Sequence, residues 1–561
     1  MTDPIISAQE QIKELITNAF SAAIAAGLLP EAEPAPFHVE IPADRSHGDF
    51  STNAAMVNAR AFRRAPAMIA DALIGNASLE GTYFEKVEAA GPGFINFTLG
   101  SKYYTDILLK AYREGADYGK SDHGKGKRVL VEFVSANPTG PMHVGNARGG
   151  AIGDCLAETL SWAGYYTERE FYVNDAGNQI EKFGLSLDIR YRQIFDPEVE
   201  MPEDAYHGAD IIEHAKNFAA IHGDKYLNAD EAERKKALVA FALPKNIAGL
   251  ERDLLSYRIK YDTWFRESTL HADGSVKDII ERLKANGYTY EKDGALWLKA
   301  EQFGCDKDFV LVRSNGIPTY IVPDIAYHYN KLVIRGFDVA INVLGADHHG
   351  YVPRMKAALQ ALDIDPERLK VVLMQMVRLI NKDGEVIKAS KRSGKAITLV
   401  TLLDEVPTDA ARFFFNLREP NTHCDFNLDL AVEQSSQNPV YYCQYAHARI
   451  CSILSKLCPD GADGIPADSL DALTAPEERE LIRHIGALPG QVVSSAEAMD
   501  PSGITRYAME LAALFHKFYN ACRCDVPDTQ VKNARLFLCR TVRDIMKNVL
   551  GLMKIDAPEK M

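Results

Sequence analysis

Residues 128–150 read RVLVEFVSANPTGPMHVGNARGG, and they give the clearest indication of the fold class. Its first part, 128–134, is dense in β-branched and aromatic side chains and predicts a buried strand. Residues 135–145 form a loop punctuated by proline and glycine, and apolar side chains at helical spacing predict a helix over 146–164. A second strand is expected at 168–173. This order of strand, helix and strand is typical of a parallel α/β sheet.

The same alternation is expected to resume further along the chain, at residues 309–313, 339–344 and 371–376. Residues 185–310 are richer in helical patterns and in charge, which suits a solvated insertion. From about Asp404 to the end the pattern is helical, with no convincing strand.

These patterns predict a multidomain α/β protein. It combines an α/β N-terminal module, a Rossmann-type parallel-sheet domain with helical insertions and an all-α C-terminal domain. A polar stretch at 120–127 reads as a linker after the first module. The expected boundaries are 1–118 for the module, 119–425 for the parallel-sheet domain with its insertion at about 185–310, and 426–561 for the helical domain.

The composition narrows the class of protein. Of 561 residues, 47% are hydrophobic and 25% are charged, as in globular chains and unlike disordered ones. No stretch resembles a membrane span of about 18 apolar residues, and the N-terminus lacks the pattern of a secretory signal, so we expect a cytoplasmic protein with no membrane partner. The nine cysteines are odd in number and include no CxxC pair, so neither a disulfide framework nor a structural zinc is expected.

The common nucleotide-binding loops are missing from the sequence: the glycines at 115–121 are spaced too closely for a P-loop, and 145–150 does not read GxGxxG. One candidate is the loop 136–146, because backbone N–H groups at the following helix N-terminus favour anions. Within it, His143 could donate a hydrogen bond to a phosphate. The alternative is a turn that only shapes the connection.

A second candidate is the basic loop Lys388-Ala-Ser-Lys-Arg392. Residues 376–395 carry a net charge of +4, and a loop of this kind can reach phosphates and close over them. Taken alone, it could equally be an exposed basic loop.

Together these loops resemble the paired signatures of class I aminoacyl-tRNA synthetases. His143-Val-Gly-Asn146 matches the signature HIGH, and Lys388–Arg392, which begins 245 residues later, matches KMSKS. Further stretches are similar to the arginyl-tRNA synthetases of that class, and the resemblance covers essentially the whole chain. These stretches are Glu132–Asn137, Gly345–Gly350, Asp409–Phe415, Gln444–Arg449 and the C-terminal Ala557–Met561.

Two departures from the signatures stand out. Asn146 replaces the final His of HIGH, and an amide still hydrogen-bonds a nucleotide but carries no charge. In the basic loop, Ala389 replaces Met and Arg392 replaces the final Ser, while Lys391 is retained.

The resemblance implies an arginine–tRNA ligase that acts in protein synthesis. L-Arginine and ATP would give arginyl-adenylate, and the arginyl group would pass to the 3′-terminal adenosine of tRNA(Arg). No enzyme nucleophile is needed, so catalysis is positioning and charge stabilisation. The catalytic residues would be His143, Asn146, Lys388 and Lys391. Magnesium would enter with ATP, whose site would comprise Ala136, Pro138, Gly140, His143, Gly145, Asn146, Gly345, Asp347 and Ser390.

The resemblance places the arginine pocket on Glu132, Asn137, Tyr320 and Asp324. A carboxylate matches the guanidinium fork in a bidentate way that an ammonium does not fill, and Asn137 would hold the amino group. Tyr320 and Asp324 stand four residues apart, but the prolines at 318 and 323 argue against a regular helix there. The alternative for Asp324 is a surface carboxylate or a helix cap.

The resemblance also places two tRNA contacts. Phe94 and Asn96 in the N-terminal module would meet the tRNA elbow by stacking on a base and reading its edge. Their alternative is a core Phe beside a turn Asn. Tyr445 and Arg449 are expected on the anticodon side, within the wider set Tyr441, Tyr445, His447, Arg449, Lys517, Tyr519 and Arg523. A monomer is implied.

Three competing readings remain. Another class I synthetase, such as the cysteinyl or glutamyl enzyme, would lack this N-terminal module, and the cysteinyl enzyme would show zinc ligands. A small-molecule nucleotidyltransferase would lack the helical C-terminal domain. A non-catalytic tRNA-binding paralogue is disfavoured by the intact His143, Lys388, Lys391 and Asp324.

The net charge of −14 argues at first against a nucleic-acid partner, which lysine and arginine must bind. The charge is unevenly spread, however. Residues 181–236 carry −5 and residues 454–500 carry −6, whereas residues 504–554 carry +5. The acidic average therefore does not exclude tRNA.

Overall fold

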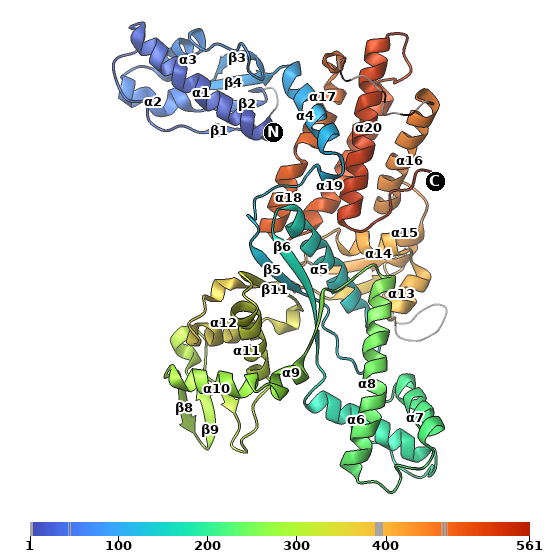
Figure 1. The fold of residues 1–561 in the computed structure, drawn as a ribbon. Coiled ribbons are helices and arrows are strands. Elements are labelled where there is room, and N and C mark those ends of the chain that lie inside the picture. Colours follow the sequence, from blue (N-terminus) through green and yellow to red (C-terminus); the bar gives the residue numbers. More distant parts are fainter. Residues whose placement is uncertain are drawn as a thin grey trace.

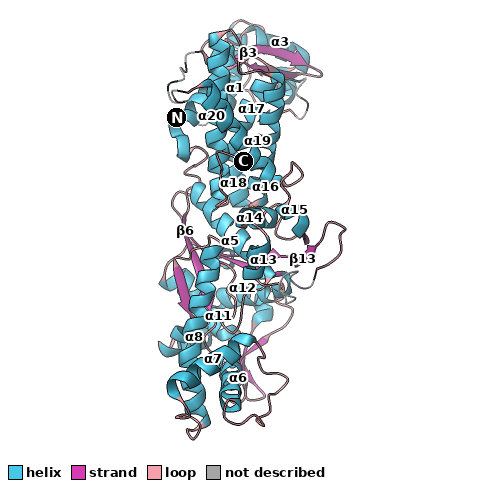
Figure 2. Ribbon diagram, turned by 90° about the vertical axis from the view of Figure 1, so that its right-hand side faces the viewer, coloured by secondary structure: helices cyan, strands magenta, loops and turns pink. Residues whose placement is uncertain are grey.

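The computed structural model describes residues 4–42, 44, 47–387, 397–459, 461, 464, 467 and 469–561. The molecule is elongated in both ribbon views (Figures 1 and 2). The N-terminal module lies at one end, beside the C-terminal helices. The parallel sheet is central, and the helices inserted into it lie at the far end (Figure 1).

The central sheet has five strands, all parallel, in the order β12-β11-β5-β6-β7. The chain first passes from β5 to β6 on one side through helix α5 (Val144–Trp162), and it enters β11 on the other side of β5 much later. The order of strands therefore reverses between β5 and β11, and ligands of open α/β sheets bind at such a point, beyond the carboxyl ends of the strands. The strands are β5 (Arg128–Glu132), β6 (Tyr166–Val173), β7 (Thr263–Arg266), β11 (Val339–Gly345) and β12 (Leu369–Met374).

One expectation for the segments between these strands is wrong. The stretch 185–310 is rich in helices, as expected, and also supplies β7, an edge strand of the parallel sheet. The strand expected at 309–313 forms, but it belongs to a separate antiparallel sheet in the order β10-β9-β8. Both strands have four residues, too few for a pattern to reveal their partners. The elements here are α6 (Asn178–Gln193), α7 (Ala209–His222), α8 (Glu231–Ser256), α9 (Glu267–Ala272), α10 (Ser275–Ala285), β8 (Thr289–Lys292), β9 (Ala295–Leu298), β10 (Phe309–Val312), α11 (Ile321–Tyr329) and α12 (Tyr351–Ala361).

The N-terminal module is an antiparallel sheet in the order β1-β2-β4-β3, covered by helices. Its first helix buries Ile12, Ile16 and Phe20, which recur every four residues as an amphipathic helix requires. The elements are α1 (Pro4–Ala25), β1 (Val39–Glu40), β2 (Phe50–Thr52), α2 (Ala54–Phe62), α3 (Pro66–Gly75), β3 (Phe84–Ala90), β4 (Phe94–Leu99) and α4 (Ser101–Glu114).

The chain after residue 404 is mostly helical, as expected, but its described residues include a strand. Strand β14 (Cys424–Asn427) pairs in parallel with β13 (Val377–Ile380), and the expectation of no strand there is wrong. Its four residues cannot be distinguished from a loop by periodicity. The helices are α13 (Leu399–Glu405), α14 (Thr408–Phe415), α15 (Leu428–Val432), α16 (Pro439–Leu457), α17 (Pro476–Gly486), α18 (Leu488–Glu497), α19 (Ser502–Ala521) and α20 (Thr529–Leu552).

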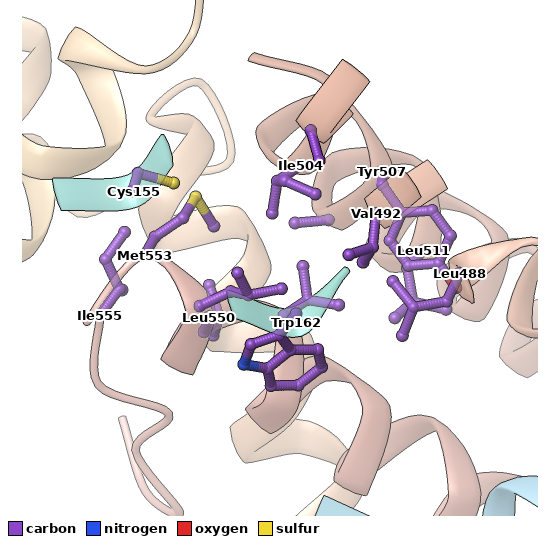
Figure 3. Packing of buried hydrophobic residues seen from close by; sticks show 14 of the residues in the cluster. Cys155, Trp162, Leu488, Val492, Ile504, Tyr507, Leu511, Leu550, Met553 and Ile555 are labelled. Carbon is purple, nitrogen blue, oxygen red and sulfur yellow. The ribbon is translucent and has the colours of Figure 1, made fainter. Parts of the chain in front are cut away.

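The core of the C-terminal helices is continuous with that of the parallel sheet. Figure 3 shows Cys155 and Trp162 of α5 packed among side chains of α18, α19 and α20. Beside this core, Arg412 of α14 and Asp154 of α5 form a fully buried ion pair at 2.6 Å. Arg483 of α17 binds the Tyr104 hydroxyl at 3.0 Å and so ties the helices to the N-terminal module. None of the helices in the described residues is sufficiently long and apolar to cross a membrane.

Candidate active site

A cavity of about 1050 Å³ lies beyond the carboxyl ends of β5 and β11. Its walls come from the loop after β5, the start of α5, helix α11, the end of β11 and residues 374–377. Of the residues singled out in the sequence, it brings together Glu132, His143, Gly145, Asn146, Asp324, Gly345 and Asp347.

The other predicted residues lie around or outside this cavity. Tyr320 is 63% exposed and lines a neighbouring cavity of about 580 Å³, which shares Asp324 and Asp347 with the first. Asn137 is exposed, and Pro138 is buried with its carbonyl accepting a hydrogen bond from Asn246 of α8. Neither of these, nor the half-buried Ala136 and Gly140, lines the two cavities. Lys388, Ser390 and Lys391 lie outside the described residues.

The start of α5 is built by the residues that match HIGH. His143 is the N-cap residue, with an extended backbone and an exposed side chain. The Asn146 side chain turns back, and its Oδ1 accepts the His143 backbone N–H at 3.0 Å. This is the half of a capping box that Glu or Gln usually supplies at the third helical position. Asn146 therefore holds the helix start that points into the cavity.

Residues that follow the basic loop return to this helix start. Thr398 forms a β-bridge with His143, and the Leu399 backbone N–H donates to the Met142 carbonyl at 2.9 Å. Thr398 and Leu399, which follow the basic loop, therefore lie beside His143. The spacing of residues in the sequence does not predict this contact.

Asp324 lies in the first turn of α11, and the doubt about a helix there is wrong. Pro323 is the third residue of α11, where its missing N–H costs no intrahelical hydrogen bond, and Tyr320 precedes the helix as its N-cap residue. Burial, reinforced by the nearby carboxylates Glu132 and Glu267, raises the pKa of Asp324 to about 8. Among the described residues, none donates a hydrogen bond to its carboxylate or pairs with it as a salt bridge.

Glu132 is bound quite differently. Its Oε2 lies 2.5 Å from Nζ of Lys331, and its Oε1 accepts a hydrogen bond from the Ser135 hydroxyl at 2.9 Å. Burial acts to raise the pKa of this carboxyl, but attraction to Lys331 and its hydrogen bond outweigh burial and lower the pKa. Glu132 is thus an ionised carboxylate already paired with a cation of the protein.

Sequence reasoning missed several residues of this pocket. Tyr172, His328, Asn342 and Tyr351 line the cavity, and Glu267 acts on Asp324 from the start of α9. Each lies on a strand of the parallel sheet, directly after such a strand, or on α11 or α12. Only the pairing of distant strands could have pointed to them, because none belongs to a recognisable motif.

The tRNA candidates lie at two distant places. Phe94 is half-buried at the start of β4, and Asn96 is 5% exposed with its Oδ1 accepting a hydrogen bond from Ser51. On α16, Tyr445 is 39% exposed. Tyr445 lines an aromatic groove of about 410 Å³ between α16 and α19, together with Ser436, Tyr441, Tyr442 and His516.

Arg449 lies one helical turn from Tyr445, with its guanidinium 4.5 Å from the centroid of the Tyr519 ring. Two other members of the wider set are engaged within the protein. His447 is buried and its Nδ1 bonds the Pro558 carbonyl, while Lys517 pairs with Glu480 at 2.6 Å. Within the described residues, no group of three His, Cys, Asp or Glu side chains is arranged to hold a metal ion.

Comparisons with known proteins cover the whole chain. The family model described as tRNA synthetases class I (R), catalytic domain, matches residues 108–451. The arginyl tRNA synthetase N terminal domain matches residues 10–99, and the DALR anticodon binding domain matches residues 443–561.

Individual proteins agree with these matches. An arginine–tRNA ligase of Ruminiclostridium cellulolyticum is 52% identical over 560 residues, 99% of each chain. A Campylobacter jejuni crystal structure assigned as an arginyl-tRNA synthetase is 35% identical with a TM-score of 0.74, covering 82% of this chain and 100% of that one. The arginyl-tRNA synthetase of Thermus thermophilus, at 22% identity, shares the fold over 100% of both chains with a TM-score of 0.73.

Proposed function

The chain belongs to the arginyl-tRNA synthetase family and ligates arginine to tRNA with ATP as a substrate, and we propose that the cavity between β5 and β11 is the site of both steps. Arginine is activated there to arginyl-adenylate, and the arginyl group then passes to the terminal adenosine of tRNA(Arg).

The unpaired carboxylate of Asp324 is the observation that supports this site most strongly. A half-buried acid without a cation is costly, and a guanidinium that binds it in a bidentate way would relieve that cost. Glu267 adds negative potential from α9. Glu132 contributes charge as well, but both its oxygens are engaged, so it is a poorer partner for a guanidinium fork than Asp324.

The phosphate side of the reaction is assigned to the start of α5. The free backbone N–H groups of its first turn favour the ATP phosphates, and His143 is placed to donate to phosphoryl oxygens as charge develops. Gly145, Gly345 and Asp347 line the same cavity and are assigned to the nucleoside. Lys388 and Lys391 are assigned to the leaving pyrophosphate, and magnesium enters with ATP.

Transfer requires tRNA to reach this cavity while its distant parts are held elsewhere. We assign the anticodon side to the aromatic groove of Tyr445, with Arg449 beside it, because exposed aromatic rings stack unpaired bases. Phe94 and Asn96 are assigned to the elbow. The proposed domains are 1–118, 119–425 and 426–561, in a cytoplasmic monomer.

One experiment tests the site and the substrate together. ATP–pyrophosphate exchange is measured with each amino acid, with and without tRNA(Arg), for the parent protein and for Asp324→Ala. We expect exchange with arginine and with no other amino acid, and loss of that exchange in Asp324→Ala while circular dichroism shows that the variant is folded. Normal arginine exchange by the variant with tRNA present would remove Asp324 from the pocket.

A further inference from the structure

Lys331 is a cation with no exposed surface, and its partners Glu132, Asn342 and Tyr327 line the cavity. It lies in the turn Asn330–Ile334, where the end of α11 widens into a π-helical turn, a geometry found often at functional sites. Its Nζ contacts Glu132 Oε2 at 2.5 Å and Asn342 Oδ1 at 3.2 Å, and lies 3.9 Å from the centroid of the Tyr327 ring. A buried ammonium with this complete a set of partners is fixed in place.

A hydrogen-bonded chain links the same ammonium to Asp324. Asn342 Nδ2 donates to His328 Nε2 at 2.8 Å, and His328 Nδ1 donates to the Asp324 backbone carbonyl at 2.8 Å. The carbonyl can only accept, so Nδ1 carries the ring proton and Nε2 accepts from Asn342. Burial lowers the pKa of His328 to about 3, so this chain keeps one protonation state near neutral pH.

Lys331 therefore makes two neighbouring carboxylates different. It occupies Glu132, whereas Asp324 has no hydrogen-bond donor or ion-pair partner among the described residues. Without Lys331, Glu132 would become a second buried carboxylate with no counter-charge, which would either take up a proton or turn toward the guanidinium.

We propose that Lys331 is a positioning residue for arginine binding: it holds Glu132 in an internal ion pair and so leaves Asp324 as the carboxylate open to the guanidinium. This inference rests on the proposed role of Asp324. In this proposal Lys331 contacts neither ATP nor arginine. It affects arginine binding only through its ion pair with Glu132. The ATP end of the cavity, at His143, has no part in the network.

The test is a double-mutant cycle on arginine activation. Lys331→Met, Glu132→Gln and the double variant are compared by ATP–pyrophosphate exchange with tRNA(Arg) present. We expect Lys331→Met to raise the arginine KM at least about tenfold, while the ATP KM stays within about twofold. Glu132→Gln raises the arginine KM too, because it leaves an unpaired ammonium that repels the substrate. The double variant removes both unpaired charges and recovers part of the loss.

Lys110 provides a matched control. It is a buried lysine of α4 that pairs with Glu114 at 2.8 Å and lies 5.1 Å from the centroid of the Tyr118 ring, far from the cavity. Lys110→Met should leave the arginine and ATP KM values unchanged. Thermal unfolding of all variants separates a change in binding from a loss of structure.

The results that would overturn the inference are specific. A double variant whose arginine KM equals the product of the two single effects, or equal rises in the KM of arginine and ATP, overturns the inference. If Lys331→Met does not fold, the double variant is compared with Glu132→Gln, and it must bind arginine more tightly. Asp324→Asn keeps the two failures apart: a normal arginine KM in that variant defeats the proposed role of Asp324, whatever the Lys331 variants show.

Discussion

Thr398 and His143 face each other in a β-bridge, and the next backbone N–H, of Leu399, donates to the Met142 carbonyl. The chain that leaves the basic loop is therefore attached to the start of α5, where His143 caps the helix. The residues that follow the second signature thus lie beside the first signature, although the two signatures are 245 residues apart in the sequence. A substitution at either end of this contact should therefore change the rate at which arginine is activated with ATP.

His143→Ala should lower kcat for arginyl-adenylate formation by about 10²–10³-fold, as the loss of one donor to developing charge does elsewhere. Its side chain is exposed and not part of the packed core, so the unfolding temperature of the variant should stay close to that of the parent protein. The rate of ATP–pyrophosphate exchange, measured with saturating ATP and arginine and with tRNA(Arg) present, gives the effect. A rise in the ATP KM with unchanged kcat would show that His143 only binds the ground state.

Asn146→Ala should destabilise the protein by about 1 kcal/mol, since the His143 backbone N–H loses its capping acceptor. Asn146→Gln keeps a side-chain acceptor and serves as the control. Urea denaturation, followed in the transition that includes the parallel-sheet domain, gives the difference. Equal stability of the alanine and glutamine variants would show that the cap contributes nothing.

The arginine KM should depend on pH through Asp324, whose pKa is raised to about 8 by burial and then by the carboxylates Glu132 and Glu267. The guanidinium needs the ionised form, so the KM should rise as pH falls below about 8, approaching tenfold per unit. Other titratable groups facing it are Lys331, His328, Tyr172 and Tyr351. Initial rates of exchange between pH 6 and 9 measure the slope, and a flat profile would contradict it.

The same raised pKa has a consequence for stability. Between the unfolded pKa of an aspartate, about 4, and the folded value near 8, the folded state holds a proton that the unfolded chain releases. The contribution of Asp324 to stability is thus present at low pH and is lost as pH rises toward 8. Asp324→Asn should therefore be more stable than the parent at pH 8 and no more stable at pH 4, as thermal unfolding at both values would show.

Tyr445→Ala should raise the KM for tRNA(Arg) in aminoacylation by about 5–150-fold, the range that corresponds to loss of one base stacked on an aromatic ring at 1–3 kcal/mol. The arginine and ATP KM values should not change. Tyr166→Ala is the control, because Tyr166 is also exposed but is the first residue of β6, at the amino end of the strand, whereas the cavity lies beyond the carboxyl ends of the strands. An unchanged tRNA KM would remove the groove from the tRNA-binding surface.

The parallel-sheet class and the helix after β5 follow from the amino-acid sequence, because strong local patterns with period two or 3.6 persist in any tertiary context. The segment 128–162 folds as its pattern predicts, as β5, the loop and α5. The match of the two signature loops to one family also needed no coordinates, since it is a statement about residue order.

The assembly of the site depends on contacts between distant segments of the chain. The strands β7, β10 and β14 have four residues each, so their sheets are chosen by the partners that the fold offers. Pro323 looked like a helix breaker, yet it lies where a helix tolerates proline. Glu132 and Lys331 are 199 residues apart and meet because β5 and β11 are neighbours and α11 leads into β11. The ion pair between Glu132 and Lys331 leaves Asp324 as the carboxylate that is open to a guanidinium. Because both partners of this pair are buried, separating them would cost much more free energy than it would at the surface.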